Sequence, residues 1–248
     1  MGKNWIVALG DSFTYGDELP DDDLARGNQH LRAVIKTARS YRKFNDIPIE
    51  VFEQRNKYIK LMCDEGLDYK SFCNSYTYIN KACVKERIGC RNLAVNGRSV
   101  DHILIDLIDY FEYNQPSGEI FVIGTGLNYR HTKFDQNKKE YASDNWRFMA
   151  NEAFGSGNDD FFDYVYEYFS NQEYHEIMYQ SAVDEMRYIL ESHNTPYYIF
   201  NVKERLDQIT SEHKLGRCAF GHNDQQAHQI LSDEIALKIR EIREQLND

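Results

Sequence analysis

The sequence predicts a three-layer α/β/α sandwich with a mostly parallel, flavodoxin-like sheet and a helical insertion after the first strand. The segments expected to form strands are apolar along their whole length, which is typical of parallel strands buried on both faces. Segments with helical periodicity separate these strands, and this alternation predicts helical layers on a parallel sheet. The 248 residues are enough for one large α/β domain, so we expect a single domain over residues 1–248, with the insertion at residues 21–72.

The N-terminal half of the chain begins with a short strand and continues with helices. Trp5–Gly10 is apolar, partly β-branched and closed by glycine, as expected of a buried strand. Asp21–Phe44 begins with three aspartates, which favour a helix N-terminus, and basic residues follow them. Ile47–Gly66 and Ser71–Arg87 are expected to be the next helices, and Gly89–Ala94 is expected to be the second strand.

The C-terminal half alternates more regularly between helices and strands. Ser99–Phe111 carries apolar residues at helical spacing, and Glu119–Gly124 (EIFVIG) is the clearest strand in the sequence. Residues 127–160 have no clean periodicity, so we expect a long loop with helical pieces. The remaining elements expected are a helix, a strand and a final helix: Glu173–Ser192, Pro196–Val202 and Asp224–Gln245.

The composition restricts the partners that the protein is expected to have. The formal net charge is −11, so non-specific binding to nucleic acid is not expected. No apolar run reaches the ~20 residues that cross a bilayer, and the first apolar run is too short for a signal peptide. Five cysteines at irregular spacing predict reduced thiols in a cytoplasmic protein. The histidines and aspartates lack metal-ligand spacing, so neither a metal nor a cofactor is expected.

Polar residues directly follow three of the expected strands. They are Gly10-Asp11-Ser12, Asn96-Gly97 and Gly126-Leu127-Asn128. In open parallel sheets, ligands bind beyond the carboxyl ends of the strands. We therefore expect these three loops to gather at one edge of the sheet and to form the functional site there.

Four short sequence blocks span nearly the whole chain. They are GDSFTYG at residues 10–16, NLAVNG at 92–97, GTGLN at 124–128, and GHND at 221–224 followed by a final helix. One such block carries little information, but four in order, each after a predicted strand or before the right helix, form a much stronger signal. Together they resemble the SGNH hydrolase superfamily, also called GDSL esterases and lipases. The GDSFTYG-like start is similar to that of many phage and bacterial chains.

The resemblance implies a serine hydrolase mechanism. Ser12 would be the nucleophile, and His222 would act first as general base and then as general acid. The family's oxyanion donors correspond to the N–H groups of Ser12 and Gly97 and to the side chain of Asn128. Asp11 is expected to organise the loop as a hydrogen-bond acceptor and is a candidate for contact with the substrate.

Two positions depart from the family's pattern. The aspartate that usually stands two or three residues before the histidine is absent, because Ala219 and Phe220 occupy those positions. A backbone carbonyl, Asp224 or a carboxylate from elsewhere in the chain can orient His222 instead, or the site can work as a Ser–His dyad. The second departure is that tyrosine, not aspartate, follows Asn128.

Cations flank the expected site. Arg98 follows the second block, Arg130 and His131 follow the third, and Arg217 precedes the fourth. Any one of them can be a solvated surface charge. If they converge on the site, they favour an anionic substrate, because arginine binds phosphate oxygens bidentately. A further basic stripe lies on one face of a predicted helix in the insertion: Arg32, Lys36, Arg39 and Lys43.

The sequence therefore predicts a metal-independent serine hydrolase that cleaves an ester of a small substrate. An acyl or acetyl ester is the default that the resemblance implies, and the flanking cations favour an anionic one. A phosphomonoesterase acting on a small phosphorylated metabolite, such as a nucleoside 5′-monophosphate, is the first alternative. A binding protein that kept the fold without the chemistry is the second, and the missing aspartate favours it. The oligomeric state is not defined by the sequence.

Overall fold

The fold is built on a parallel β-sheet with the strand order β2-β1-β3-β6. The computed structural model describes residues 5–41, 46–95, 97–126, 130–135, 140–145, 172–219 and 222–247. The sheet strands are β1 (Trp5–Gly10), β2 (Gly89–Asn92), β3 (Glu119–Thr125) and β6 (Tyr197–Asn201). All neighbouring pairs are parallel, so the carboxyl ends of these strands lie at one edge. The order is the one expected of a flavodoxin-like sheet.

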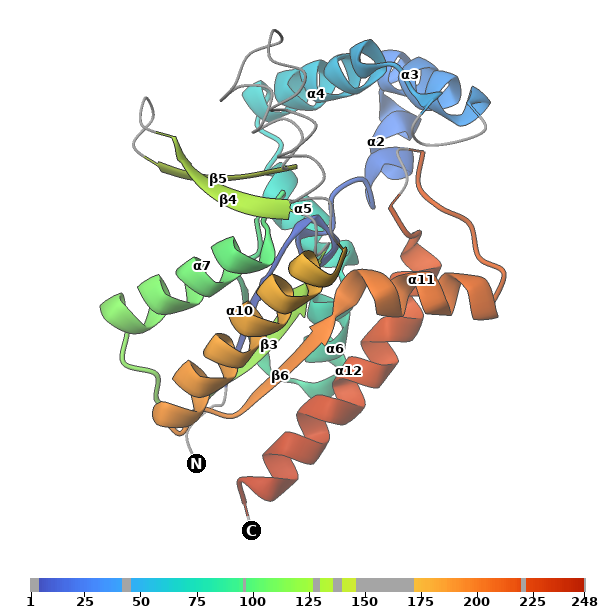
Figure 1. Ribbon diagram of the computed structural model, residues 1–248. Helices are drawn as coiled ribbons and strands as arrows, with labels where there is room; N and C mark the ends of the chain where they lie inside the picture. The colour runs from blue at the N-terminus through green and yellow to red at the C-terminus, as the bar shows by residue number, and fades with distance from the viewer. Residues whose placement is uncertain are drawn as a thin grey trace, which may run out of the picture.

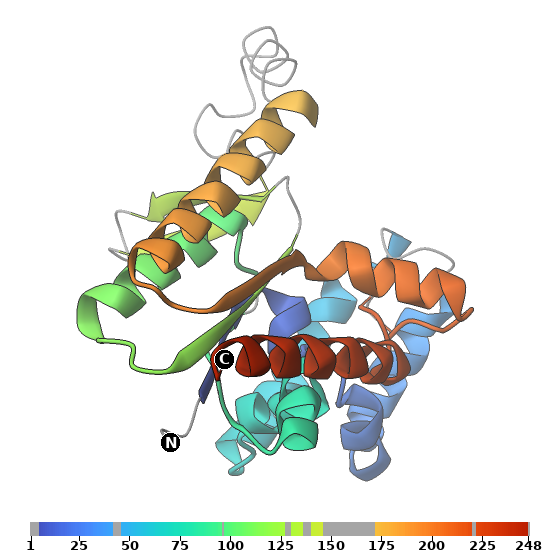
Figure 2. The same cartoon turned by 90° about the horizontal axis from the view of Figure 1, so that it is seen from below.

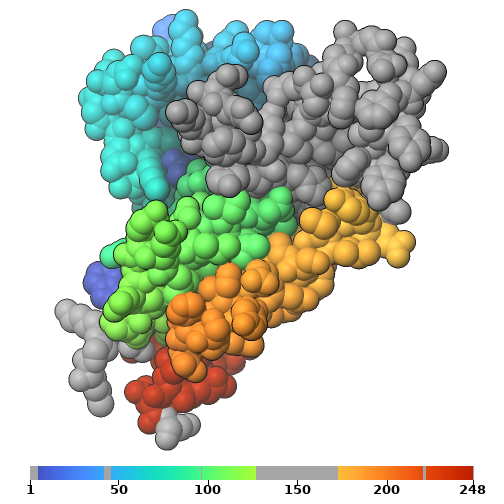
Figure 3. All heavy atoms as spheres, turned by 60° about the vertical axis from the view of Figure 1, so that its left-hand side comes forward, coloured from blue at the N-terminus to red at the C-terminus, as the bar shows by residue number. Residues whose placement is uncertain are grey.

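Helices cover both faces of this sheet, which confirms the predicted α/β/α sandwich (Figures 1 and 2). Successive residues of β1 point to opposite faces and contribute to two separate cores. Ile6 and Ala8 pack toward α6 (Tyr78–Glu86), α11 (Val202–Glu212) and α12 (Gln225–Gln245). Val7 and Leu9 pack toward α7 (Val100–Tyr113) and α10 (Gln172–Ser192), which lie side by side in Figure 3.

Residues 21–72, the segment predicted as an insertion, are helical, and their first three helices stand at the end of the molecule opposite the two termini (Figure 1). The helices are α2 (Asp21–Gly27), α3 (Gln29–Ser40), α4 (Ile49–Asp64) and α5 (Tyr69–Tyr76). Apolar side chains from α2, α3 and α4 form a small core of their own, which includes Ala25, Leu31, Val34, Ile35 and Val51. The insertion can therefore hold its shape beside the carboxyl edge of the sheet.

Two of the predicted helices are wrong as single elements. The one predicted over Asp21–Phe44 is interrupted at Asn28, whose side chain accepts a hydrogen bond from Leu31 N (3.0 Å) and caps α3. The one predicted over Ser71–Arg87 is interrupted at Thr77, whose hydroxyl accepts from Asn80 N (3.2 Å) and caps α6. In both cases a residue that favours N-caps begins a new helix inside an apparently continuous pattern.

The prediction of a loop with helical pieces over residues 127–160 is wrong where the structure describes that range. An antiparallel pair is present there, β4 (Arg130–Asp135) and β5 (Glu140–Asn145), next to α7 (Figure 1). Neither strand has an apolar run or a clean alternation that signals a strand. Helix α11 was also not predicted, although Val202, Leu206 and Ile209 form its buried stripe. Within the described residues, no helix is both long and apolar enough to cross a membrane.

Candidate active site

Ser12 lies where the first strand ends and the chain turns into a short helix. β1 ends at Gly10, and α1 (Ser12–Tyr15) starts with the serine itself. Asp11 caps this helix by accepting a hydrogen bond from Phe13 N (3.0 Å), and both Asp11 and Ser12 are buried. Asp11 is thus a loop-organising acceptor, as predicted from the turn chemistry. The tight strand-to-helix turn brings Ser12 to the carboxyl edge of the sheet.

Close packing around this turn requires glycine at the ends of two neighbouring strands. A Cβ on Gly10 or Gly124 would collide with the side chain of Thr14, whose hydroxyl lies 3.0 Å from Tyr78 Oη. A Cβ on Gly126 would collide with the carboxylate of Asp11. The chain leaving β3 therefore passes directly against the loop that carries Ser12.

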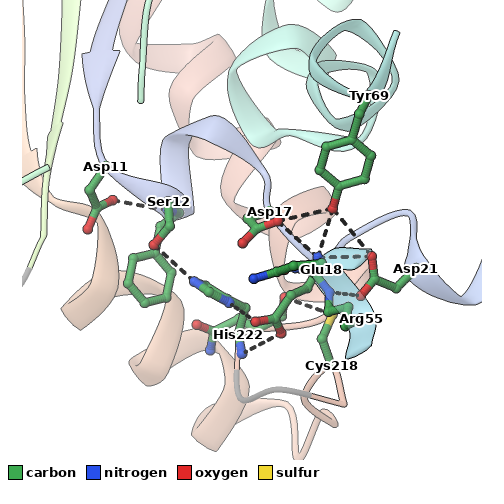
Figure 4. Close-up of polar contacts among 12 residues, drawn as sticks. Asp11, Ser12, Asp17, Glu18, Asp21, Arg55, Tyr69, Cys218 and His222 are labelled. Atoms are coloured by element: carbon green, nitrogen blue, oxygen red, sulfur yellow. Dashed lines mark hydrogen bonds and ion pairs between the residues drawn. The ribbon is translucent and has the colours of Figure 1, made fainter. Parts of the chain in front are cut away.

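The imidazole of His222 contacts the hydroxyl of Ser12. His222 Nε2 lies 2.9 Å from Ser12 Oγ, although 210 positions separate the two residues in the sequence (Figure 4). The ring of Phe13 packs edge-on against the imidazole, with 4.8 Å between ring centroids. The histidine loop is anchored by Cys218 N, which donates to the carbonyl of His222 (2.7 Å), and by Asn223, which is fully buried.

The opposite nitrogen of the same imidazole faces a carboxylate from the loop that carries Ser12. His222 Nδ1 lies 2.7 Å from Glu18 Oε1, and the backbone N–H of His222 donates to Glu18 Oε2 (3.4 Å) (Figure 4). Glu18 is 5% exposed. Of the groups that the sequence allowed beside His222, the structure thus places a carboxylate from elsewhere in the chain at Nδ1. Asp224 has another role, because its side chain caps α12 by accepting from Gln226 N and Ala227 N.

Glu18 reaches this position through an unusual backbone conformation. Its φ is +66°, in the left-handed region that non-glycine residues rarely adopt. Such a conformation persists only where the surroundings hold it, and it occurs preferentially at functional sites. One restraint comes from the histidine side of the site, since Gln225 Nε2 donates to the carbonyl of Leu19 (2.8 Å).

The environment favours the protonated form of His222. Burial lowers the pKa of the imidazole, but the carboxylates of Glu18, Asp17 and Asp11 together raise it by more, so the pKa lies above its ordinary value. An imidazole held between a serine hydroxyl and a carboxylate can accept the serine proton and keep the resulting charge. The Ser12, His222 and Glu18 side chains are therefore arranged in a way that can activate a hydroxyl group.

Of the two further oxyanion donors that the resemblance implies, Gly97 lies within the described residues and Asn128 does not. Gly97 has φ +83°, and the loop before it follows β1, because Val95 N donates to the carbonyl of Gly10 (3.1 Å). Asn92 ties this loop to α1, since its amide donates to the Thr14 carbonyl (3.0 Å). Asn128 lies outside the described residues, as do Asn96 and Tyr129.

The cations predicted near the site are engaged elsewhere wherever their side chains are described. Arg98 pairs with Asp106 (Nε to Oδ2, 3.1 Å) and also contacts the ring of His102. Burial and Arg98 together lower the pKa of His102 to about 4. Arg217 donates to Asp207 Oδ1 (2.7 Å). The backbones of Arg130 and His131 lie in β4, and their side chains lie outside the described part.

His228, the other histidine near the fourth block, lies in the core. It is 1% exposed on α12, its ring is tilted against Tyr78, and burial lowers its pKa to about 3. This environment agrees with the structural role expected from its place inside the final helix. In the described ranges, no three His, Cys, Asp or Glu side chains are arranged to hold a metal ion.

Comparisons with known proteins add little to this geometry. No family model and no curated protein sequence matches the chain. Among solved structures it is similar to a member of the lipolytic protein G-D-S-L family from Veillonella parvula DSM 2008, with 9% identity and a TM-score of 0.38 over 95% of this chain and 97% of that one. At this level of similarity no residue role can be transferred from that structure to this chain.

The residue that sequence reasoning missed is Glu18. It follows the nucleophile block in the acidic pair Asp17-Glu18, bracketed by Gly16 and Pro20. The pattern is also typical of a solvated turn before a helix. Gly16 is the feature of the sequence that could have indicated Glu18. This glycine, with φ +84°, ends α1 and leaves the acidic pair close to Ser12.

Proposed function

We propose that this protein is a serine hydrolase that cleaves a carboxylic ester of a small substrate. Ser12 is the nucleophile, His222 is the general base and then the general acid, and Glu18 orients His222. The observation that carries the proposal is the pair of contacts on one imidazole, 2.9 Å to Ser12 Oγ and 2.7 Å to Glu18 Oε1. A hydroxyl, an imidazole and a carboxylate in this order form the arrangement that activates the serine of a catalytic triad.

The reaction follows from the positions of these atoms. Ser12 Oγ attacks the ester carbonyl while its proton moves to His222 Nε2, and Glu18 stabilises the imidazolium through Nδ1–H. The N–H groups of Ser12 and Gly97 and the Asn128 side chain are the donors proposed for the oxyanion. His222 then gives the proton to the leaving alkoxide, which departs as an alcohol. Water, deprotonated by His222, attacks the acyl-serine, and His222 returns this proton to Ser12 Oγ as the acid leaves.

The contacts bear on the alternatives. The binding-protein alternative depends on the absence of an acid before His222, and the Glu18 contact removes that reason. The phosphomonoesterase alternative depends on free cations at the site, and the pairings of Arg98 and Arg217 lend it no support. A small substrate, a cytoplasmic location and independence from metals and cofactors remain predictions, as do the substrate contacts proposed for Asp11, Arg98, Arg130 and His131.

A substrate panel tests the proposal. Purified protein and its S12A and H222A variants are assayed with p-nitrophenyl acetate, p-nitrophenyl phosphate and nucleoside 5′-monophosphates. We expect turnover of the acetate and a loss of at least about 10³-fold in kcat in both variants. Ser12-dependent turnover of the phosphates alone would replace the proposal with the phosphomonoesterase. Folded protein without any Ser12-dependent turnover would favour the binding protein.

A further inference from the structure

A buried ion network outside the catalytic residues joins the insertion to the loop that carries Glu18. Its centre is Arg55 on α4, which is 5% exposed. Arg55 Nε donates to Asp21 Oδ2 (2.6 Å), and Nη2 donates to Asp21 Oδ1 (3.0 Å) and to Asp17 Oδ1 (2.9 Å) (Figure 4). Tyr69 on α5 completes the network, since its hydroxyl donates to Asp17 Oδ1 (3.0 Å).

The two carboxylates held by Arg55 lie on either side of Glu18. Asp17 is the residue before it, and Asp21 N donates back to the carbonyl of Glu18 (3.0 Å). The arginine therefore fixes both ends of the short turn in which Glu18 adopts its left-handed φ of +66°. A planar guanidinium suits this task, because its fork of donors sets the positions of two acceptors together.

We propose that Arg55 is a positioning residue through which the insertion holds Glu18 against His222. This inference rests on the proposed function of the Ser12–His222–Glu18 site and adds a role for the insertion. Without Arg55, two buried carboxylates would lose their main counter-charge, and the turn would relax from its strained conformation. Glu18 would then leave Nδ1, while Ser12 and His222 would keep their own anchors.

The direction in which the pKa of His222 shifts when Arg55 is replaced distinguishes this positioning role from a purely structural or electrostatic role. The titratable groups acting on the imidazole are Glu18, Asp17 and Asp11, and His228 lies near enough to interact with it. Loss of the Arg55 charge alone would leave Asp17 less neutralised, and this would raise the pKa of His222. Loss of the Glu18 contact removes the main group that raises this pKa, so the pKa would fall.

The experiment compares R55M, R55K, E18Q and the control R39M. Arg39 lies in the same insertion but pairs with Asp22 at the surface, where the two side chains are 50% and 55% exposed. The pKa of His222 is measured by NMR titration of its imidazole signal, which is identified by its absence in H222N. This readout does not require turnover. Thermal melting and kcat are measured in parallel.

We expect R55M to melt at a lower temperature, to show a lower His222 pKa that approaches that of E18Q, and to lose kcat by roughly tenfold or more. R55K keeps the charge but not the fork and should lie between wild type and R55M. R39M should match wild type in every measurement. The double variant E18Q/R55M should lose no more kcat than E18Q alone, because both changes remove the same contact.

Two results would overturn the inference. One is a folded R55M whose His222 pKa is unchanged or raised and whose kcat is unchanged; the other is additive loss of kcat in the double variant. If R55M does not fold, R55K decides: an intermediate pKa supports the role, and a wild-type pKa and kcat refute it. A wild type with no turnover would refute the proposed function, while the NMR result would still decide whether Arg55 places Glu18.

Discussion

Replacing Glu18 by glutamine tests the catalytic arrangement in a way that the structure makes specific. The carboxylate faces two nitrogens of His222 at once: Oε2 accepts from the backbone N–H, and Oε1 lies 2.7 Å from the ring Nδ1. A glutamine has one acceptor and one donor end in the same space. If its oxygen serves the backbone N–H, its NH₂ group faces Nδ1 and favours the tautomer protonated at Nε2. That tautomer cannot accept the proton of Ser12.

The expected loss in kcat for E18Q is large. A hydrogen bond to a charged group contributes about 1.5–3 kcal/mol, which corresponds to roughly 10- to 150-fold in rate if only the imidazolium is destabilised. The wrong tautomer raises the loss to about 10⁴-fold. E18A leaves the tautomer free and should lose less than E18Q, a ranking that steric or stability effects would not produce.

The assay is steady-state hydrolysis of p-nitrophenyl acetate across pH, with thermal melting to confirm the fold of each variant. E53Q, which changes an exposed glutamate on α4, is the matched control and should behave as wild type. An E18Q variant that is folded and retains kcat within about threefold would refute the role of Glu18.

Three further predictions concern titration and packing. Because Glu18 holds the pKa of His222 above its ordinary value, kcat/KM should rise with pH through a midpoint above ~6.5, and E18Q should lower that midpoint; a midpoint below ~6 in wild type would contradict the assignment. His228 stays neutral in the folded protein until about pH 3, whereas it protonates near 6.5 in the unfolded chain. The contribution of His228 to the free energy of unfolding should therefore be fully present above pH ~6.5 and should fall by ~1.4 kcal/mol for each pH unit below that value. Urea unfolding at pH 7 and pH 5 measures this: H228Q should show a weaker pH dependence than wild type, and an unchanged dependence would contradict the prediction. Gly126→Ala places a methyl group against the Asp11 carboxylate and should lower kcat at least tenfold, whereas Gly27→Ala, at an open position, should not; equal kinetics for both would refute the packing argument.

The layers of the fold could be predicted because buried strands and buried helix faces appear in the sequence as patterns of apolar residues. β1 and β3 are nearly fully buried and consist mainly of apolar residues, so their positions and parallel direction could be predicted from these apolar runs. The antiparallel pair β4–β5 shows no apolar pattern of this kind, because its residues are mostly polar. The breaks at Asn28 and Thr77 depend on single capping side chains, which also occur inside continuous helices.

The candidate site could be predicted only in part, for a related reason. Ser12 and His222 lie in short motifs whose spacing from strands and helices is informative. Glu18 depends on a left-handed turn and on a distant arginine, Arg55, and neither leaves a local pattern. The pairing of Arg98 with Asp106 likewise depends on how α7 begins, so a list of nearby cations could not indicate which of them are free.

The central claim is that Ser12 is a nucleophile activated by His222 and Glu18. The most direct measurement is the site and rate of reaction with a fluorophosphonate, followed by intact mass and peptide mapping. The account predicts one adduct, on Ser12, that is absent in S12A and forms far more slowly in H222A and E18Q. No adduct on folded wild-type protein, or an equal rate of Ser12 labelling in all three proteins that retain the serine, would contradict it.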